Sequence, residues 1–264
     1  MDRISNLPNE IICHIVSFLS AKEAALTTVL SKRFLNLFNI IPNLEFDEMD
    51  NIQGSFTDFL DGVLALPASS RIRNFSLKIF NCVEVAQYAH VNRCLCAVLK
   101  HGVLYLELDM HVEKRYSLPF ELFTCKTVVK LKLESAGYGF VVDALPQNAS
   151  LPALETLILE YIRFKDRCGC AFEKLLSACH VLKELTIDSM EWKRWKWSGN
   201  ISCPTLQRLT IRHGDVMESD FTGITLDTPS LTYFNCSDLV PDEYPVVNLD
   251  SLVNSRSQLR RICT

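Results

Sequence analysis

Residues 128–133 read VVKLKL, and the same alternation of apolar and other residues returns at intervals along most of the chain. Successive side chains of a strand point to opposite faces, so Leu131 and Leu133 would point inward while Lys130 and Lys132 point outward. Apolar residues at the first, fourth and sixth positions define the pattern. It occurs seven times, at 72–77, 103–108, 128–133, 154–159, 182–187, 206–211 and 231–236. A divergent earlier copy stands at 41–46.

The spacing of these copies predicts a solenoid. The gaps between the fourth residues of successive copies are 31, 25, 26, 28, 24 and 25 residues, and five of the six fall within the range of about 20–29 that is typical of leucine-rich repeats. One copy cannot bury its apolar face alone, so neighbouring copies must stack with their strands parallel. We therefore predict an α/β solenoid of about seven to eight irregular repeats with a parallel sheet on its concave face. An ordinary α/β sheet with similar strands is the alternative interpretation.

The segments between the predicted strands are unequal. Those at 86–99 and 171–179 have the apolar spacing of helices, whereas 199–204 is too short and broken for one. The asparagine that usually follows the last leucine by three residues is missing, and Ala136, Ile162 and Gly214 stand in its place. No asparagine ladder can therefore connect these turns.

The outward residues of the strands would form one continuous wall. They mix positive, negative and neutral side chains with no stripe of a single charge, which suits a polypeptide partner better than a phosphate backbone. The plain alternative is that most of them are solvated surface. We expect a few of them to bind a substrate protein, and the candidates are Tyr105, Glu107, Lys130, Lys132, Arg208, Arg212 and Tyr233.

The first forty residues read differently from the rest. Pro8 can begin a helix, apolar residues recur at helical spacing up to Leu19, and two shorter helices are expected near 20–26 and 31–38. Three such helices carry more apolar residues than a core of this size can enclose. The surplus apolar face should be covered either by the rest of this chain or by another protein.

The strings at 2–19 and 25–38 resemble the F-box of plant proteins, with Phe34 and Phe38 where that family usually has tryptophan. The strings LLSAC at 175–179 and CPTL at 203–206 resemble the irregular leucine-rich repeats of plant F-box proteins. The resemblance implies an F-box at 1–42, built of three helices, and a leucine-rich-repeat solenoid at 43–264. It also implies that the F-box binds a Skp-type adaptor, with Arg33 at the rim of a face made by Leu7, Pro8, Ile11, Ile15, Leu19, Leu30, Arg33 and Phe34.

Together these parts resemble the substrate-recognition subunit of a Skp–cullin–F-box ubiquitin ligase. Such a subunit has no catalytic activity or cofactor of its own, and it works in the nucleus or cytoplasm. Its partners would be the Skp-type adaptor and a substrate protein, and its role would belong to the protein-degradation pathway that conjugates ubiquitin.

A second interpretation comes from residues 191–197, which read EWKRWKW and contain all three tryptophans. Aromatic rings alternating with Lys and Arg can stack on single-stranded nucleic acid or bind an anionic small ligand. They can equally form a connecting loop whose rings pack on the next turn while the charges stay in water. The net charge of −4 argues against a general affinity for nucleic acid.

Composition and cysteine spacing narrow the classes of protein to which this sequence can belong. With 48% apolar residues the chain can bury a core, and no apolar stretch is long enough to span a bilayer, so we expect a soluble intracellular protein without membrane contact. The 11 cysteines form no Cys-x-x-Cys pair, which favours free buried thiols over a metal site. Phosphate-binding glycine motifs and known hydrolase motifs are missing from the sequence, which favours a non-catalytic protein. The catalytic alternative is that one of the cysteines carries ubiquitin.

Overall fold

The computed structural model describes residues 7, 40–49, 55–68, 70–137, 139–142, 144–164, 170–188, 199–212, 224–237, 247–248 and 254–257. The three helices expected before residue 39 and the tryptophan-rich string at 191–197 lie outside these residues. Everything that follows concerns the described part of the chain. The boundary between the two expected domains, near residue 42, therefore stays a prediction.

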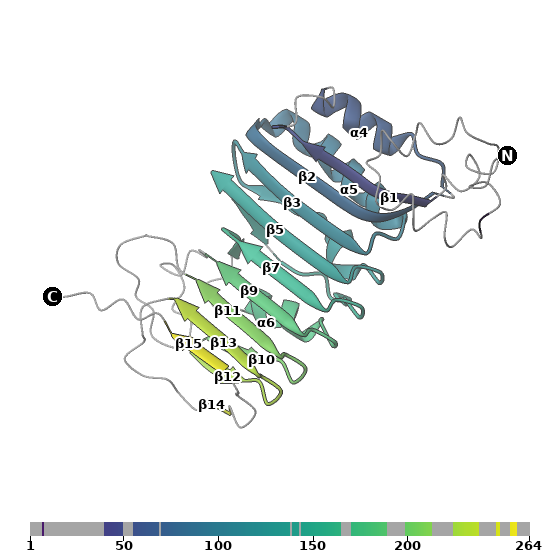
Figure 1. Ribbon diagram of the computed structural model, residues 1–264. Coiled ribbons are helices and arrows are strands. Elements are labelled where there is room, and N and C mark those ends of the chain that lie inside the picture. The colour runs from purple at the N-terminus through teal and green to yellow at the C-terminus, as the bar shows by residue number, and fades with distance from the viewer. Residues whose placement is uncertain are drawn as a thin grey trace.

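A parallel sheet is the main feature of the fold, and Figure 1 shows its strands side by side in chain order. Nine described strands form it: β1 (Ile40–Asp47), β2 (Arg71–Val83), β3 (Tyr105–Val112), β5 (Lys130–Gly137), β7 (Thr156–Glu160), β9 (Glu184–Asp188), β11 (Arg208–Arg212), β13 (Tyr233–Ser237) and β15 (Asn254–Ser257). Their order never reverses, unlike the order in a doubly wound sheet. The predicted stack of parallel strands is confirmed, with the divergent copy at 41–46 in β1.

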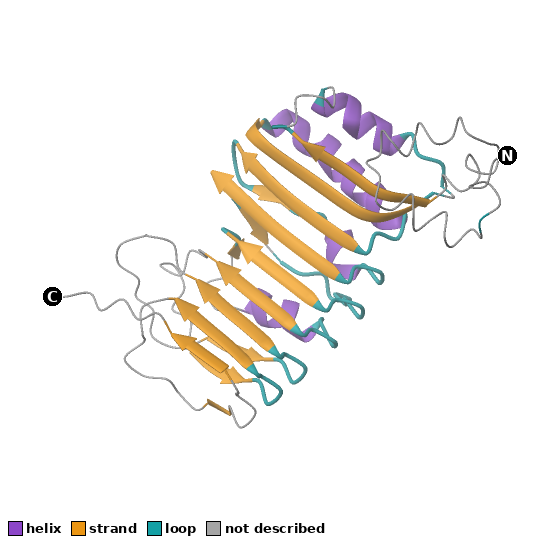
Figure 2. Cartoon of the chain, viewed as in Figure 1, coloured by secondary structure: helices purple, strands orange, loops and turns teal. Residues whose placement is uncertain are grey.

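Helices and short strands connect these strands. The helices are α4 (Phe56–Leu64), the 3₁₀ turn η1 (Val85–Gln87), α5 (Tyr88–Lys100), the 3₁₀ turn η2 (Phe120–Thr124) and α6 (Cys170–Ser177). Figure 2 shows the helices spread along the large sheet, with α4 and α5 at its amino-terminal end and α6 beside the later strands. Two small parallel sheets are formed by β4 (Tyr116–Ser117), β6 (Phe140–Val142) and β8 (Arg163–Phe164), and by β10 (Gly199–Ser202), β12 (Ile224–Asp227) and β14 (Val247–Asn248). The helices predicted at 86–99 and 171–179 are thus confirmed, and the segment after 198 forms a strand.

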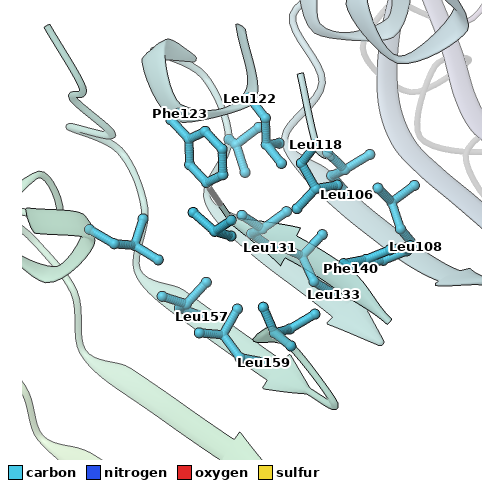
Figure 3. Close-up of a cluster of buried hydrophobic side chains, with 14 of the residues drawn as sticks. Leu106, Leu108, Leu118, Leu122, Phe123, Leu131, Leu133, Phe140, Leu157 and Leu159 are labelled. Atoms are coloured by element: carbon cyan, nitrogen blue, oxygen red, sulfur yellow. The ribbon is translucent and has the colours of Figure 1, made fainter. Parts of the chain in front are cut away.

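The core is a ladder of apolar side chains at the three positions of the repeat. At the fourth position Leu106, Leu131 and Leu157 are register partners on β3, β5 and β7, and each is at most 2% exposed. Figure 3 shows this ladder with Leu122 and Phe123 of η2 packed near it. Burying each such side chain contributes roughly 1.5–3 kcal/mol, and it does so only when both neighbouring repeats are present.

The amino-terminal end of the ladder is closed by aromatic residues of α4. Ser55 begins this helix by accepting a hydrogen bond from the backbone N–H of Asp58 at 3.3 Å. Phe59 then lies 5.2 Å from the ring of Phe46 in β1 and 6.1 Å from the ring of Phe75 in β2, measured between centroids. The same core therefore extends from the large sheet under α4.

Backbone carbonyls and threonines connect neighbouring repeats where their strands begin. The carbonyl of Val129 accepts hydrogen bonds from the N–H groups of both Glu155 and Thr156, at 2.8 and 3.1 Å. The same doubled contact recurs at the start of the strands that follow. The hydroxyl of Thr205 donates to the carbonyl of Leu182 at 2.7 Å, and Thr127 makes the matching bond to Val103 at 2.8 Å. These bonds satisfy backbone groups at the starts of the strands.

Adjacent residues on β7 offer a direct test of the ladder. Leu157 is fully buried on the inner face, whereas Ile158 is half-buried on the outer face. We expect Leu157→Ala to lower the free energy of unfolding by about 2–5 kcal/mol, because it opens a cavity between two repeats. Ile158→Ala removes the same number of carbons and should cost less than half as much. Urea denaturation of both variants measures the difference, and equal losses would contradict the assignment of the inner face.

Candidate binding face

The side chains that alternate with the ladder form the open face of the large sheet. Because the strands pair in register, these side chains lie in three rows that run across the strands. The first row is Asn74, Tyr105, Lys130, Thr156, Glu184, Arg208 and Tyr233. The second row is Ser76, Glu107, Lys132, Ile158, Thr186, Thr210 and Asn235, and the third is Lys78, Asp109, Glu134, Glu160, Asp188 and Arg212. All seven substrate-binding candidates from the sequence lie on this face.

Four of these candidates line one cavity. It has a volume of about 380 Å³, and its lining is Asn74, Phe75, Ser76, Tyr105, Leu106, Glu107, Lys130 and Lys132. The hollow exists because Ser76 is short and stands beside much longer side chains on β3 and β5. Sequence reasoning missed Asn74 and Ser76, although the same alternation in the copy at 72–77 places them on this face.

A chain of charges holds the middle of the cavity wall. Glu107 lies 3.3 Å from the ammonium of Lys132 and 3.9 Å from that of Lys78, and the hydroxyl of Ser76 donates to it at 3.3 Å. Lys132 also reaches Glu134 at 2.9 Å. Burial lowers the pKa of Lys132, but its hydrogen bond to Glu134 and the nearby carboxylates outweigh burial and raise that pKa overall. Lys132 therefore stays charged.

The remaining three candidates form a separate cluster on β11 and β13. The guanidinium carbon of Arg208 lies 4.3 Å from the ring centroid of Tyr233, and Arg208 also pairs with Glu184 at 3.5 Å. Arg212 pairs with Asp188 at 3.8 Å. Strands β7 and β9 separate this cluster from the cavity, a distance of roughly 14 Å at the usual strand spacing. The structure therefore divides the predicted site into two groups.

The third row gathers negative charge at its centre. Asp109, Glu134, Glu160 and Asp188 stand next to one another on four neighbouring strands. Burial, together with the charge of Glu134, raises the pKa of Glu160 to about 7, and the same two causes raise the pKa of Asp109. The expectation that this face carries no stripe of a single charge was therefore wrong, because the register aligns these four acids in one row.

Of the eight adaptor-binding candidates, Leu7 alone is described, and it is half-buried.

The structure describes six free cysteines, four of which are buried, and burial raises the pKa of Cys94 and of Cys179 to about 12. Thiols of that kind are poor nucleophiles at neutral pH. Among the described residues, no three His, Cys, Asp or Glu side chains gather as a metal site.

In the part of the chain that the structure describes, no helix is both long enough and apolar enough to cross a bilayer.

Known protein families match two separate parts of the chain. A family model described as an F-box domain matches residues 4–46, and one described as the LRR repeats of the FBD-associated F-box protein At5g56370 matches residues 91–243. The F-box/LRR-repeat protein At3g58980 of Arabidopsis thaliana is 64% identical over 98% of this chain and 44% of its own length. The F-box/LRR-repeat protein At4g14103 of the same plant is 39% identical over 98% of this chain and 68% of its own length.

The chain is shorter than many of the curated relatives that it matches. The F-box/LRR-repeat protein At3g62440 of Arabidopsis thaliana is 51% identical over 98% of this chain, which covers 60% of that relative. The chain thus spans about half the length of many of the curated relatives it matches. No solved structure matches the chain at a significant level.

The raised pKa of Glu160 predicts a pH dependence of stability. In the unfolded chain this carboxyl would titrate near its ordinary value of 4.5, whereas in the folded chain it holds its proton until about pH 7. The folded state binds more protons between these values, so the stability that Glu160 contributes is lost as the pH rises through 7. Glu160→Gln cannot ionise, so its unfolding midpoint relative to that of the wild type should rise from pH 5 to about pH 7 and then level off.

Thermal unfolding at several pH values measures this difference. Glu173→Gln, which changes an exposed carboxylate on α6, is the matched control and should show no such trend. A difference that stays constant with pH would overturn the assignment.

Proposed function

Because this chain belongs to the F-box/LRR-repeat protein family, we propose that it is the substrate-recognition subunit of a Skp–cullin–F-box ubiquitin ligase. The observation that carries the proposal is the pairing of an F-box match at residues 4–46 with a repeat body that presents one continuous open face. Each part has one binding task. The F-box would bind the adaptor, and the open face would bind the protein to be modified.

The adaptor contact is proposed on the apolar face of the F-box. Its residues are the predicted set Leu7, Pro8, Ile11, Ile15, Leu19, Leu30, Arg33 and Phe34. A helical segment of this size exposes more apolar area than it can enclose, and packing against a partner's helices removes that area from water. Phe34 and Phe38 would supply the aromatic bulk that tryptophan supplies in other members of the family.

The substrate contact is proposed on the open face, which has the dimensions of a polypeptide site. Nine strands at a spacing of about 4.8 Å give a face roughly 38 Å across. An extended segment advances about 3.3 Å per residue, so four or five residues would reach from Lys130 in the cavity to Arg208 in the second cluster. Both ends of such a segment would meet an aromatic side chain, Tyr105 or Tyr233, beside a cation.

The mechanism would be one of proximity. A receptor that holds the adaptor with one part and the substrate with the other raises the effective concentration of substrate lysines beside the ubiquitin carrier. The rate gain then depends on geometry and on the lifetime of the complex. It requires no nucleophile from this chain, in agreement with the buried, weakly acidic thiols of Cys94 and Cys179.

The alternative role in binding nucleic acid or an anionic small ligand rests on residues 191–197, which lie outside the described part of the chain. The acidic third row would repel phosphates from the open face. That alternative therefore stays a hypothesis about the tryptophan-rich segment alone.

Binding experiments with the purified adaptor test the proposal. We expect Ile11→Asp/Ile15→Asp to weaken adaptor binding at least about 100-fold, because the complex would bury two unpaired charges. The variant with Tyr105, Lys132, Arg208 and Tyr233 all changed to Ala is the control, and it should bind the adaptor normally while losing substrate capture. Adaptor binding that is unaffected by the Asp substitutions, or missing in the wild type, would refute the proposed role.

A further inference from the structure

The geometry points to the cavity on the open face as a pocket that accepts an anionic side chain of the substrate, with Lys130 as the pairing cation. This inference rests on the proposed function, because it identifies the chemistry of the segment that the receptor would bind. The occupant is a short acidic side chain within an extended segment. Its carboxylate would approach Lys130 while its stem lies against the ring of Tyr105.

The cavity is large enough to admit a side chain of a bound segment. Its volume of about 380 Å³ lies near the lower end of the range of small-ligand pockets, which is roughly 300–1,000 Å³. The open face gives it a wide approach, because its lining comes from β2, β3 and β5 in the first and second rows. A side chain that projects from a segment lying across the first row can therefore enter it.

Among the described residues that line the cavity, Lys130 is the cation left without a carboxylate partner. Glu107 is neutralised by Lys132 and Lys78, and Lys132 is shared with Glu134. Lys130 is exposed, and no carboxylate of the described residues lies within ion-pair distance of it. Its register partners are Tyr105 and Thr156, which are both uncharged. An anion entering the cavity would therefore find an unpaired ammonium without having to break an existing pair.

Tyr105 adds an aromatic contact and a hydroxyl group to the charge of Lys130 in the pocket. Its side chain is 39% exposed and lines the same cavity as Lys130. A flat aromatic face can cover the apolar stem of an acidic residue, and the hydroxyl can donate to its carboxylate. The combination favours a carboxylate carried on a side chain over a free small anion.

The third row determines which charges are favourable at the neighbouring positions of a bound segment. It lies four residues along each strand from the first row, or roughly 13 Å, and its centre is acidic. A second acidic residue placed over Glu134 and Glu160 would be repelled. The segment that fits best carries its acidic residue over the first row and a neutral or basic residue over the third.

Degenerate peptide pools provide a test that needs no known substrate. The probes are immobilised twelve-residue pools, random except for a fixed central Glu, Gln, phosphoserine or Lys. The full chain is applied in complex with the purified adaptor, and retained protein is measured for each pool. We expect the wild type to bind the Glu pool about fivefold more than the Gln pool, as for an accessible ion pair.

Charge reversal at Lys130 identifies the residue responsible. Lys130→Glu should abolish the preference for the Glu pool and favour the Lys pool, while Lys130→Arg should retain the wild-type preference. Lys183→Glu is the matched control, since Lys183 is an exposed lysine outside the cavity that pairs with Glu155 at 2.9 Å. It makes the same change in net charge and should leave the preference unchanged. Unfolding midpoints of all variants confirm that the fold is intact.

The outcomes separate this inference from the proposed function. A preference for the phosphoserine pool that Lys130→Glu removes would support the anion pocket and assign a phosphoryl group as its occupant in place of a carboxylate. Equal binding of the Glu and Gln pools, or equal effects of Lys130→Glu and Lys183→Glu, would overturn the inference. Adaptor binding is recorded in the same samples, so a complex that forms but shows no anion preference rejects the pocket alone.

Discussion

Burial of the apolar ladder is the constraint on which the rest of the molecule depends. Each repeat supplies a strip of side chains such as Leu106 and Leu131 that no single strand can remove from water, so neighbouring strands must stack in register. Once the inner residues are aligned, the alternation of the strand aligns the outer residues as well. The rows of the open face are therefore a consequence of packing on the other side of the sheet.

The electrostatics of the open face follow from that alignment. Lys132 lies between Glu107 and Glu134 because strands β3 and β5 pair without offset, and the same pairing places Glu134 beside Glu160. Within this arrangement some charges neutralise one another, burial raises the pKa of one carboxyl to about 7, and Lys130 has no carboxylate partner among the described residues. A repeat protein built in this way can change the chemistry of its open face through outer residues while the ladder keeps the fold unchanged.

Much of the fold was accessible from the sequence, because the repeat combines a short period with strict apolar positions. Strand β15 escaped prediction since Ser255 and Ser257 occupy the positions where the other strands carry apolar residues. The cavity and the acidic row could not be predicted in detail, because both arise from pairs of residues some 25–31 positions apart whose register depends on the intervening segments. The bonds that connect the starts of neighbouring strands, such as that from Thr205 to the carbonyl of Leu182, could not be read from the spacing of the repeat.

The register itself is the most direct test of this account. Thr186 and Thr210 are partners on β9 and β11, so Thr186→Cys/Thr210→Cys should form a disulfide on mild oxidation, because the strand spacing of about 4.8 Å is within disulfide reach. Thr186→Cys/Arg212→Cys places the thiols two residues out of register, roughly 8 Å apart, and should not cross-link. Peptide mapping distinguishes these products from the native cysteines. Cross-linking of the second pair in preference to the first would contradict the ladder and, with it, the arrangement of the open face.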